Sequence, residues 1–313
     1  MTSPLRKIAM GVFACFAAVN ACAQQPAVTV KYTVNPNKSV TFDYVKTDPG
    51  TYTVALKLSN LTNAYASETS NLTAGFYSGR LLNLEPTNKD QGIGFSYTYS
   101  YIRGKLKPKF NADFIYVLPC KNGSKVKVME STFLNATYFG NTAPDDWKVY
   151  RFGTAQEDTV TAIRKGIVVD IKDVAETNIA EGVQYSSRIN ELTIEHADGT
   201  IATYKHFKKG SFVVKVGQTV YPGTPLGVNA KNNANGMFGV TIMVAYLKSA
   251  DFEAARAQNV QNSKSMYGFV NPHFYTAEGA DVALVSQKEY TAASTPEVVK
   301  KEMSKKEQKL AAL

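Results

Sequence analysis

The sequence has few of the residues that cross-link a fold or hold a metal. It contains 3 cysteines and 3 histidines among 313 residues, and Cys120 is the only cysteine beyond the first 23 positions. A lone thiol cannot form an intramolecular disulfide, so the hydrophobic core has to stabilise the fold. The apolar stretch near the N-terminus is shorter than the ~20 residues that a membrane-spanning helix needs.

The N-terminal segment, residues 1–23, has the order of features typical of a secretory signal peptide. Arg6-Lys7 precede an apolar stretch from Ile8 to Val19, and the small residues Ala21-Cys22-Ala23 follow. This order predicts cleavage after Ala23 and export to the periplasm or cell envelope. Alternatively, Cys22 carries a lipid anchor, since the segment from Val19 to Cys22 loosely resembles a bacterial lipobox. Asn20 fits that pattern poorly.

Positive charge exceeds negative charge, with 35 Lys and Arg against 26 Asp and Glu and a formal net charge of +9. Arg6 and Lys7 account for two of these charges, so the mature chain has +7. Such a balance attracts anionic partners, but export argues against nucleic acid. We interpret the lysine clusters as solvated faces; they lie at residues 105–109, 121–127, 205–209 and 300–309.

Alternating patterns predict a β-sandwich of the immunoglobulin-like type over residues 24–110. Apolar and polar residues alternate from Thr51 to Leu58 and from Ile93 to Ile102, and a period of two places each set on one face of a strand. The stripe of Tyr97, Tyr99 and Tyr101 is best explained as part of the sandwich core. The alternative is a platform on which sugar rings stack.

A second β-rich domain is predicted over residues 111–250, followed by a β-containing extension over residues 251–293. Asp198-Gly199 lies between two strand-like runs and predicts an antiparallel hairpin, because glycine accepts the positive φ of a tight turn. Residues 294–313 have a helical pattern in which Ser294 and Glu297 form a capping box. The predicted fold class is therefore mainly β with a short C-terminal helix.

Several segments of the second domain, in this order, resemble the M23 (LytM-type) zinc metallopeptidase family. The resemblance spans roughly Tyr116 to Tyr246 and leaves more than half of the chain uncovered. It is carried by Tyr116-Val117-Leu118-Pro119, Lys148 to Phe152, Ile167-Val168-Val169, Ile194 to Thr200, Tyr204 to Phe207, and Val214 to Gly227. The resemblance implies an antiparallel β-sheet with a peptide-binding groove across it.

The zinc ligands that this resemblance implies are missing. The family binds zinc through a His and an Asp of a first motif and the second His of an H-x-H motif. No histidine occurs between Leu118 and Phe152, and Arg151 stands at the Asp position. Gly239 and Thr241 replace the two histidines of the last motif. We therefore expect no zinc, no other cofactor and no peptidase activity.

The resemblance then implies a binding groove without its catalytic metal. We expect this groove to be lined by Arg151, Tyr204, His206, Gly239, Thr241 and Asn141. The hypothesis is a non-catalytic LytM-like protein that binds peptidoglycan peptides or an envelope protein such as a wall hydrolase. Two alternatives remain, namely a metal-free or unrecognised envelope hydrolase and a structural or adhesive scaffold.

Other candidate catalytic residues have simpler explanations. Asp145-Asp146 and Glu157-Asp158 are adjacent in sequence, whereas paired acids act across a cleft of ~5 to 10 Å. Cys120 follows Pro119 in a strand-like segment and is predicted to be a small buried residue. His196 and His273 have no spacing that suggests a metal site.

Overall fold

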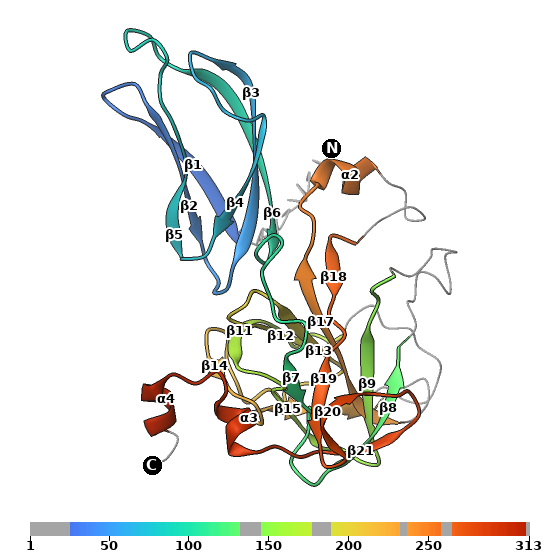
Figure 1. The fold of residues 1–313 in the computed structure, drawn as a ribbon. Coiled ribbons are helices and arrows are strands. Elements are labelled where there is room, and N and C mark those ends of the chain that lie inside the picture. The colour runs from blue at the N-terminus through green and yellow to red at the C-terminus, as the bar shows by residue number, and fades with distance from the viewer. Residues whose placement is uncertain (1–25, 132–144, 177–188, 232–236, 258–264, 311–313) are drawn as a thin grey trace, which may run out of the picture.

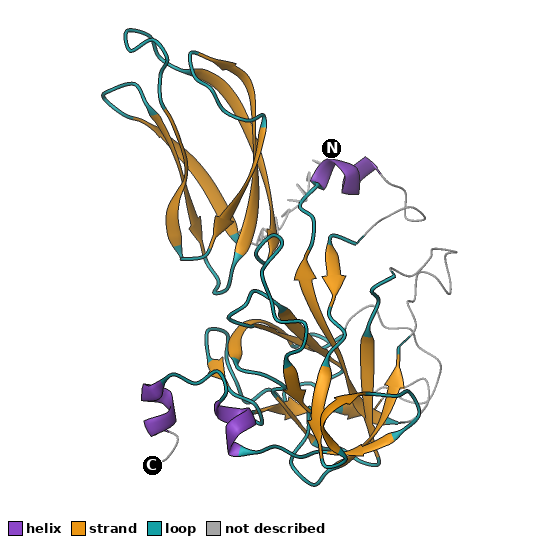
Figure 2. Ribbon diagram, viewed as in Figure 1, coloured by secondary structure: helices purple, strands orange, loops and turns teal. Residues whose placement is uncertain are grey.

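The computed structural model describes residues 26–131, 145–176, 189–231, 237–257 and 265–310. Strands in mostly antiparallel sheets dominate these residues, and the helices are short (Figures 1 and 2). The predicted mainly-β fold class is confirmed. The predicted signal segment 1–23, with Cys22, and the candidate residue Asn141 lie outside the described residues.

The first part of the chain forms two three-stranded antiparallel sheets. One contains β1 (Val28–Val34), β2 (Val40–Lys46) and β5 (Ser78–Leu84). The other contains β4 (Thr69–Ala74), β3 (Tyr52–Thr62) and β6 (Gly94–Arg103). Both sheets contribute buried side chains to one core, among them Val28, Phe42, Val54 and Leu56.

The tyrosine stripe of β6 belongs to this core. Tyr97, Tyr99 and Tyr101 pack against its buried residues. The Tyr101 hydroxyl also accepts a hydrogen bond of 3.1 Å from the backbone N–H of Ala27, and the Tyr97 ring meets Phe42 edge-on at 5.3 Å. These contacts support the structural interpretation of the stripe.

A large antiparallel sheet forms the centre of the second part (Figure 1). Its strands lie in the order β14 (Thr219–Val220), β11 (Gly166–Lys172), β12 (Glu191–Glu195), β13 (Ile201–Lys205), β17 (Phe238–Leu247), β9 (Val149–Thr154), β8 (Lys125–Glu130) and β21 (Glu289–Thr291). The long strand β17 also pairs with β16 (Ala230–Lys231) and β18 (Tyr267–Phe269).

Two small sheets accompany the central sheet. β10 (Thr159–Thr161) pairs with β15 (Pro225–Val228), and β19 (His273–Thr276) lies between β20 (Gly279–Ala283) and β7 (Ile115–Val117). The β7–β19 pair is parallel, unlike the other pairs between named strands. Strands after residue 250 therefore pair with earlier strands, so the segment 251–293 completes these sheets.

The two faces of the central sheet differ in character because side chains alternate along each strand. One face packs into the main core through residues such as Tyr150, Phe152, Leu192, Tyr204 and Ile242. Neighbouring residues of opposite parity, including Arg151, Thr193, Thr203 and Thr241, belong to the other face. Arg151, Thr193 and Thr241 are nevertheless buried, so this second face holds polar groups away from water.

The predicted hairpin between β12 and β13 is confirmed, with a slightly longer connection than expected. The backbone N–H of His196 donates to the carbonyl of Thr200 at 2.9 Å, which leaves three residues in the turn. Gly199 has φ +86°, the left-handed conformation that the sequence predicted for it.

The helices are α2 (Phe252–Ala257), α3 (Pro296–Lys300) and α4 (Lys305–Leu310). The prediction of one C-terminal helix capped by Ser294 was wrong in detail. Thr295 is the N-cap of α3, where its side chain accepts from the N–H of Val298, and a second helix begins at Lys305. Neither α3 nor α4 buries a residue, so polar contacts hold this segment.

Several contacts join the sandwich to the central sheet. The N–H of Thr51 donates to a carboxylate oxygen of Glu195 at 2.7 Å, and the Tyr267 hydroxyl donates to the carbonyl of Arg103 at 2.6 Å. An ion pair of 2.6 Å links Lys57 to Glu253. Within the ranges given above, no helix has the length and apolar character needed to cross a membrane.

Candidate binding site

Strands β9, β17 and β13 bring three of the predicted groove residues together on the polar face of the sheet. Arg151 of β9 and Lys205 of β13 lie on either side of Thr241 of β17 in the strand register. His206 directly follows β13, and a hydrogen bond of 3.1 Å joins its Nδ1 to the Thr241 hydroxyl. Arg151, Thr241 and His206 therefore form one cluster.

The backbone around His206 is unusual and tightly held. His206 has φ +75°, a conformation that few residues with a side chain adopt. Its N–H donates to the carbonyl of Asn190 at 3.0 Å, and its own carbonyl accepts from Ala230 at 2.8 Å. The buried Asn190 side chain in turn bonds to the carbonyl of Phe207 at 3.1 Å. This local frame fixes the imidazole beside Thr241.

His206 is uncharged at neutral pH in this setting. Burial lowers its pKa to about 4, and the positive charges of Arg151 and Lys205 act in the same direction. A neutral imidazole has one ring nitrogen that donates and one that accepts. The cluster thus offers hydrogen-bonding groups next to Arg151, while the neighbouring cation Lys205 is paired with Glu191 at 3.7 Å.

Arg151 is a buried guanidinium with few partners. Only 7% of the residue is exposed, and its Nη2 donates to the carbonyl of Met237 at 3.1 Å. Its Nε is buried and has no hydrogen-bond partner. Burial lowers the pKa of Arg151, but an arginine side chain stays protonated in proteins. In the part of the chain that the structure describes, no carboxylate forms an ion pair with it.

Gly239 shapes the strand next to Arg151. It has φ +156°, and a Cβ at this position would lie 2.4 Å from the carbonyl oxygen of Phe152. Strands β9 and β17 approach closely there, with Gly239 opposite Gly153. A side chain at position 239 does not fit this backbone.

The cluster does not fit the zinc that the M23 resemblance implies. Arg151 and Thr241 occupy two of the ligand positions predicted from sequence, Gly239 occupies the position of the other histidine of the last motif, and none of them supplies a histidine nitrogen or carboxylate. Over the described ranges, no group of three or more His, Cys, Asp or Glu side chains is placed to hold a metal ion.

Besides Gly239, two of the predicted groove residues lie outside this cluster. Tyr204 is fully buried on the opposite face of the sheet, where its hydroxyl accepts a hydrogen bond of 2.9 Å from the N–H of Ile163. The expectation that Tyr204 lines the groove was therefore wrong. Asn141 stays a prediction, because it lies outside the described residues.

The structure also assigns structural contacts to the other groups considered from sequence. Asp146 accepts from the N–H of Phe269 at 3.0 Å, and Glu157 pairs with Lys208 at 2.9 Å. Cys120 is buried as predicted, and burial raises the pKa of its thiol to about 12. His196 is buried, and its Nδ1 forms a hydrogen bond of 2.8 Å with the Thr200 hydroxyl.

Sequence reasoning missed the partners that position the cluster, namely Asn190, Lys205, Met237 and the backbone turn at His206. Asn190 and Met237 carry no local motif. Lys205 stands out in the sequence only as part of a basic cluster. The pairing of β13, β17 and β9 brings these residues together, and the sequence alone does not indicate the register of these strands.

Comparison with known proteins gives distant likenesses. No protein-family model matches the sequence, and no curated protein matches it. Among solved structures, the chain is similar to the M23 metalloprotease pseudoalterin from the deep sea, with 18% identity, 42% of this chain and 70% of that chain covered, and a TM-score of 0.30. It is also similar to a putative M23 peptidase from Pseudomonas aeruginosa, with 13% identity, 61% and 82% covered, and a TM-score of 0.27.

A third likeness is to the SpoIIQ–SpoIIIAH pore forming complex, with 14% identity, 42% of this chain and 84% of that chain covered, and a TM-score of 0.28. At TM-scores below 0.5, these likenesses do not assign an activity, a substrate or a partner to the chain.

The lowered pKa of His206 makes the stability of the protein depend on pH. The folded pKa is about 4 against an ordinary value of 6.5, so the unfolded chain binds more protons between these values. The free energy of unfolding therefore falls as the pH drops from 6.5 towards 4. At ~1.4 kcal/mol per pKa unit, His206 contributes up to about 3 kcal/mol of this loss.

The matched variant is His206→Asn, because asparagine tolerates positive φ and does not titrate. Urea unfolding at a series of pH values should show a flatter pH dependence below pH 6.5 for His206→Asn than for the wild type. Buried His196, whose pKa is also lowered by burial, leaves a residual slope of the same sign in both. Identical slopes for the two proteins would contradict the assignment to His206.

Proposed function

We propose that this protein is an exported, non-catalytic LytM-like protein of the cell envelope that binds a peptide carboxylate at Arg151. The observation that carries the proposal is a buried guanidinium with an unpartnered Nε and no acidic partner among the described residues. A buried charge is costly unless it is paired. Such a charge is retained where a ligand supplies the opposite charge.

A carboxylate is the anion that the surroundings favour. The planar guanidinium offers parallel N–H groups that match the two oxygens of a carboxylate. His206 and Thr241 lie beside it with hydrogen-bonding groups, and neither is charged. The cluster thus provides the positive charge of Arg151 beside neutral groups, and the nearby Lys205 is paired with Glu191 at 3.7 Å, which suits a singly charged peptide group better than a metal or a polyanion.

The residue types in the cluster do not support catalysis. A metallopeptidase needs a metal to lower the pKa of a bound water, and Arg151, Gly239 and Thr241 are not metal ligands. His206 alone, held neutral and bonded to Thr241, lacks the nucleophile and orienting acid of a metal-free hydrolase. Binding is therefore the function that these residues support best.

The proposed ligands are peptides of the cell envelope. Peptidoglycan stem peptides carry free carboxylates, and an envelope protein such as a wall hydrolase offers a carboxylate at its C-terminus or in its side chains. We propose export to the periplasm or envelope because of the signal-like segment 1–23. The proposed protein binds neither zinc nor nucleic acid.

Replacing Arg151 by methionine separates a binding role from a structural one. If the Arg151 charge is unpaired in the ligand-free protein, Arg151→Met removes a buried charge and raises the free energy of unfolding by about 1–3 kcal/mol. The same change should weaken carboxylate binding about 30-fold or more, since a lost buried charge pair costs about 2 kcal/mol or more. Denaturant unfolding and co-sedimentation with insoluble peptidoglycan measure the two effects.

Arg80→Met is the charge-matched control, because Arg80 is an exposed arginine on β5 of the sandwich. It should change neither stability nor sedimentation. A loss of stability in Arg151→Met, or wall binding that survives it, would contradict the proposed site. Stoichiometric zinc in the purified protein would overturn the non-catalytic assignment, and no wall binding by the wild type would favour a protein partner or a scaffold.

A further inference from the structure

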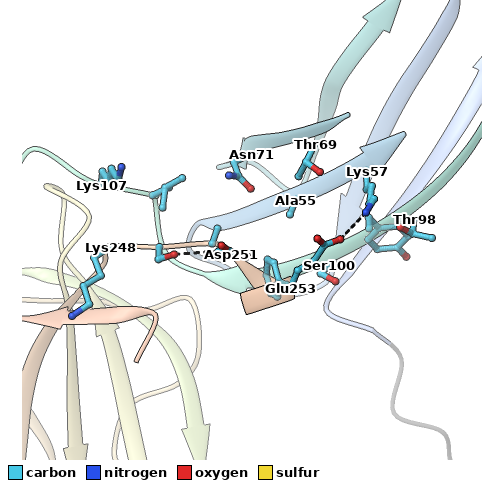
Figure 3. Close-up of a pocket in the computed structure, with 15 residues that line it drawn as sticks. Ala55, Lys57, Thr69, Asn71, Thr98, Ser100, Lys107, Lys248, Asp251 and Glu253 are labelled. Atoms are coloured by element: carbon cyan, nitrogen blue, oxygen red, sulfur yellow. Dashed lines mark hydrogen bonds and ion pairs between the residues drawn. The ribbon is translucent and has the colours of Figure 1, made fainter. Parts of the chain in front are cut away.

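A cleft lies between the sandwich and the segment that follows β17, on the side of β3 that faces away from the sandwich core (Figure 3). It encloses about 420 Å³, within the roughly 300–1,000 Å³ of small-molecule sites, which often lie where two structural units meet. It shares no residue with the Arg151 cluster.

Strand register builds one wall of this cleft as a regular polar platform. Ala55 of β3 lies between Asn71 of β4 and Ser100 of β6. Two residues further along, Lys57 lies in the same way between Thr69 and Thr98. Because side chains alternate along strands, these two rows share the outer face of the sheet, and small Ala55 leaves a hollow between polar neighbours.

The facing wall comes from Leu106, Lys107 and the residues from Lys248 to Glu253. Asp251 is fixed by its hydrogen bond from the N–H of Ala254 at 2.9 Å, at the start of α2. Glu253 reaches across to Lys57 at 2.6 Å, as the dashed line in Figure 3 shows. The ion pair between Lys57 and Glu253 therefore joins the two walls of the cleft and fixes their separation at that point.

The chemistry of the lining selects against several ligand classes. Lys57, Lys107 and Lys248 are balanced in large part by Asp251 and Glu253, so the cleft has no strong charge for a phosphate or nucleotide. A purely apolar ligand is also disfavoured, because many of the lining residues have hydroxyl, amide or charged side chains that such a ligand would leave without partners. What remains is a neutral ligand that is rich in hydroxyl groups.

We infer that this cleft binds a short neutral glycan. The two rows across the sheet offer hydrogen-bond donors and acceptors through Asn71, Thr69 and Thr98. The spacing between the rows suits the hydroxyl groups of successive sugar rings. Phe252 at the start of α2 supplies an apolar surface against which the less polar face of a ring packs. This site goes beyond the proposed function and is independent of Arg151.

Calorimetric titration of the full chain with chitotetraose and with cellotetraose tests this inference. The wild type should bind at least one of them in the millimolar range. Asn71→Ala should weaken binding about tenfold, as expected for lost hydrogen bonds, and Ala55→Phe should abolish it by filling the hollow. Thr73→Ala is the matched control, because Thr73 lies on the same face of β4 beyond the cleft and should have no effect.

No binding of either oligosaccharide by the wild type at about 10 mM would overturn the inference. Binding that is unchanged in both Asn71→Ala and Ala55→Phe, with native circular dichroism, would overturn it as well. Arg151→Met should retain full glycan binding, so a failure of the carboxylate site and a failure of the glycan site can be told apart. Equal loss of glycan binding in Arg151→Met would contradict a separate cleft.

Discussion

Replacing Arg164 by alanine is expected to lower the free energy of unfolding by about 3 kcal/mol, because a buried ion network loses its centre. Arg164 is 3% exposed. It donates to both carboxylate oxygens of Glu302, at 3.0 and 2.6 Å, and to Asp198 at 2.8 Å. Its guanidinium also lies 3.7 Å from the centre of the Phe114 ring.

The charges in this network support one another. Burial by itself lowers the pKa of Arg164, but Glu302 and Asp198 outweigh it and raise the pKa above its usual range. Without Arg164, both carboxylates lose their cationic partner, although Asp198 still accepts from the N–H and hydroxyl of Thr200 at 3.0 and 2.7 Å. The side chains of Asp198 and Glu302 are 15% and 21% exposed, so water solvates them in part. This partial solvation keeps the expected loss near the low end of the ~3–5 kcal/mol for a broken buried pair.

The same variant should release the C-terminal segment locally. Helices α3 and α4 bury no residue, and besides Glu302 the segment is held by Glu307, which pairs with Lys165 at 2.9 Å. Urea unfolding measures the global loss, and hydrogen exchange of residues 296–310 measures the local one. Lys172→Ala removes an ion pair whose lysine is 56% exposed and should cost less than ~1 kcal/mol. Equal losses in the two variants would contradict the network.

The strands of the sandwich were predictable because their pattern is local. Alternation from Thr51 to Leu58 and from Ile93 to Ile102 corresponds to β3 and β6. The hairpin at Gly199 was predictable for the same reason, since a glycine between two strand-like runs marks a position that accepts positive φ. In contrast, the break between α3 and α4 and the capping role of Thr295 depend on contacts of the tail with distant residues.

The candidate site shows why side-chain direction was harder to predict. Tyr204 and His206 are two residues apart, and simple alternation places them on one face. The strand ends at Lys205, however, and the positive φ of His206 takes its side chain out of that alternation. The result is that Tyr204 enters the core while His206 meets Thr241.

Contacts between distant residues carry no sequence signature at all. Arg164 and Glu302 are 138 positions apart, and nothing near either residue indicates the other. Met237 and Arg151 are brought together only by the pairing of β17 with β9. The types of the residues at the zinc-ligand positions were evident from sequence, but the burial of Arg151 without an acidic partner became evident only from the fold.

Gly239→Ala is expected to lower the free energy of unfolding by about 4 kcal/mol or more, because two effects add. The backbone has φ +156°, which residues with a side chain rarely adopt, and the new Cβ would lie 2.4 Å from the Phe152 carbonyl oxygen. Backbone strain costs ~1–3 kcal/mol, and relieving the clash requires β9 to move away from β17. Thermal and urea unfolding give the total loss.

Gly223→Ala separates the two effects. Gly223 has φ +83°, and a Cβ added there would meet no atom within 4 Å, so this variant should lose only the ~1–2 kcal/mol of left-handed backbone. If Gly239→Ala loses no more than Gly223→Ala, the close approach of β9 and β17 does not constrain position 239. If it loses much more, the same clash bars a histidine at position 239, the first of the two histidine positions in the last motif that the M23 resemblance implies.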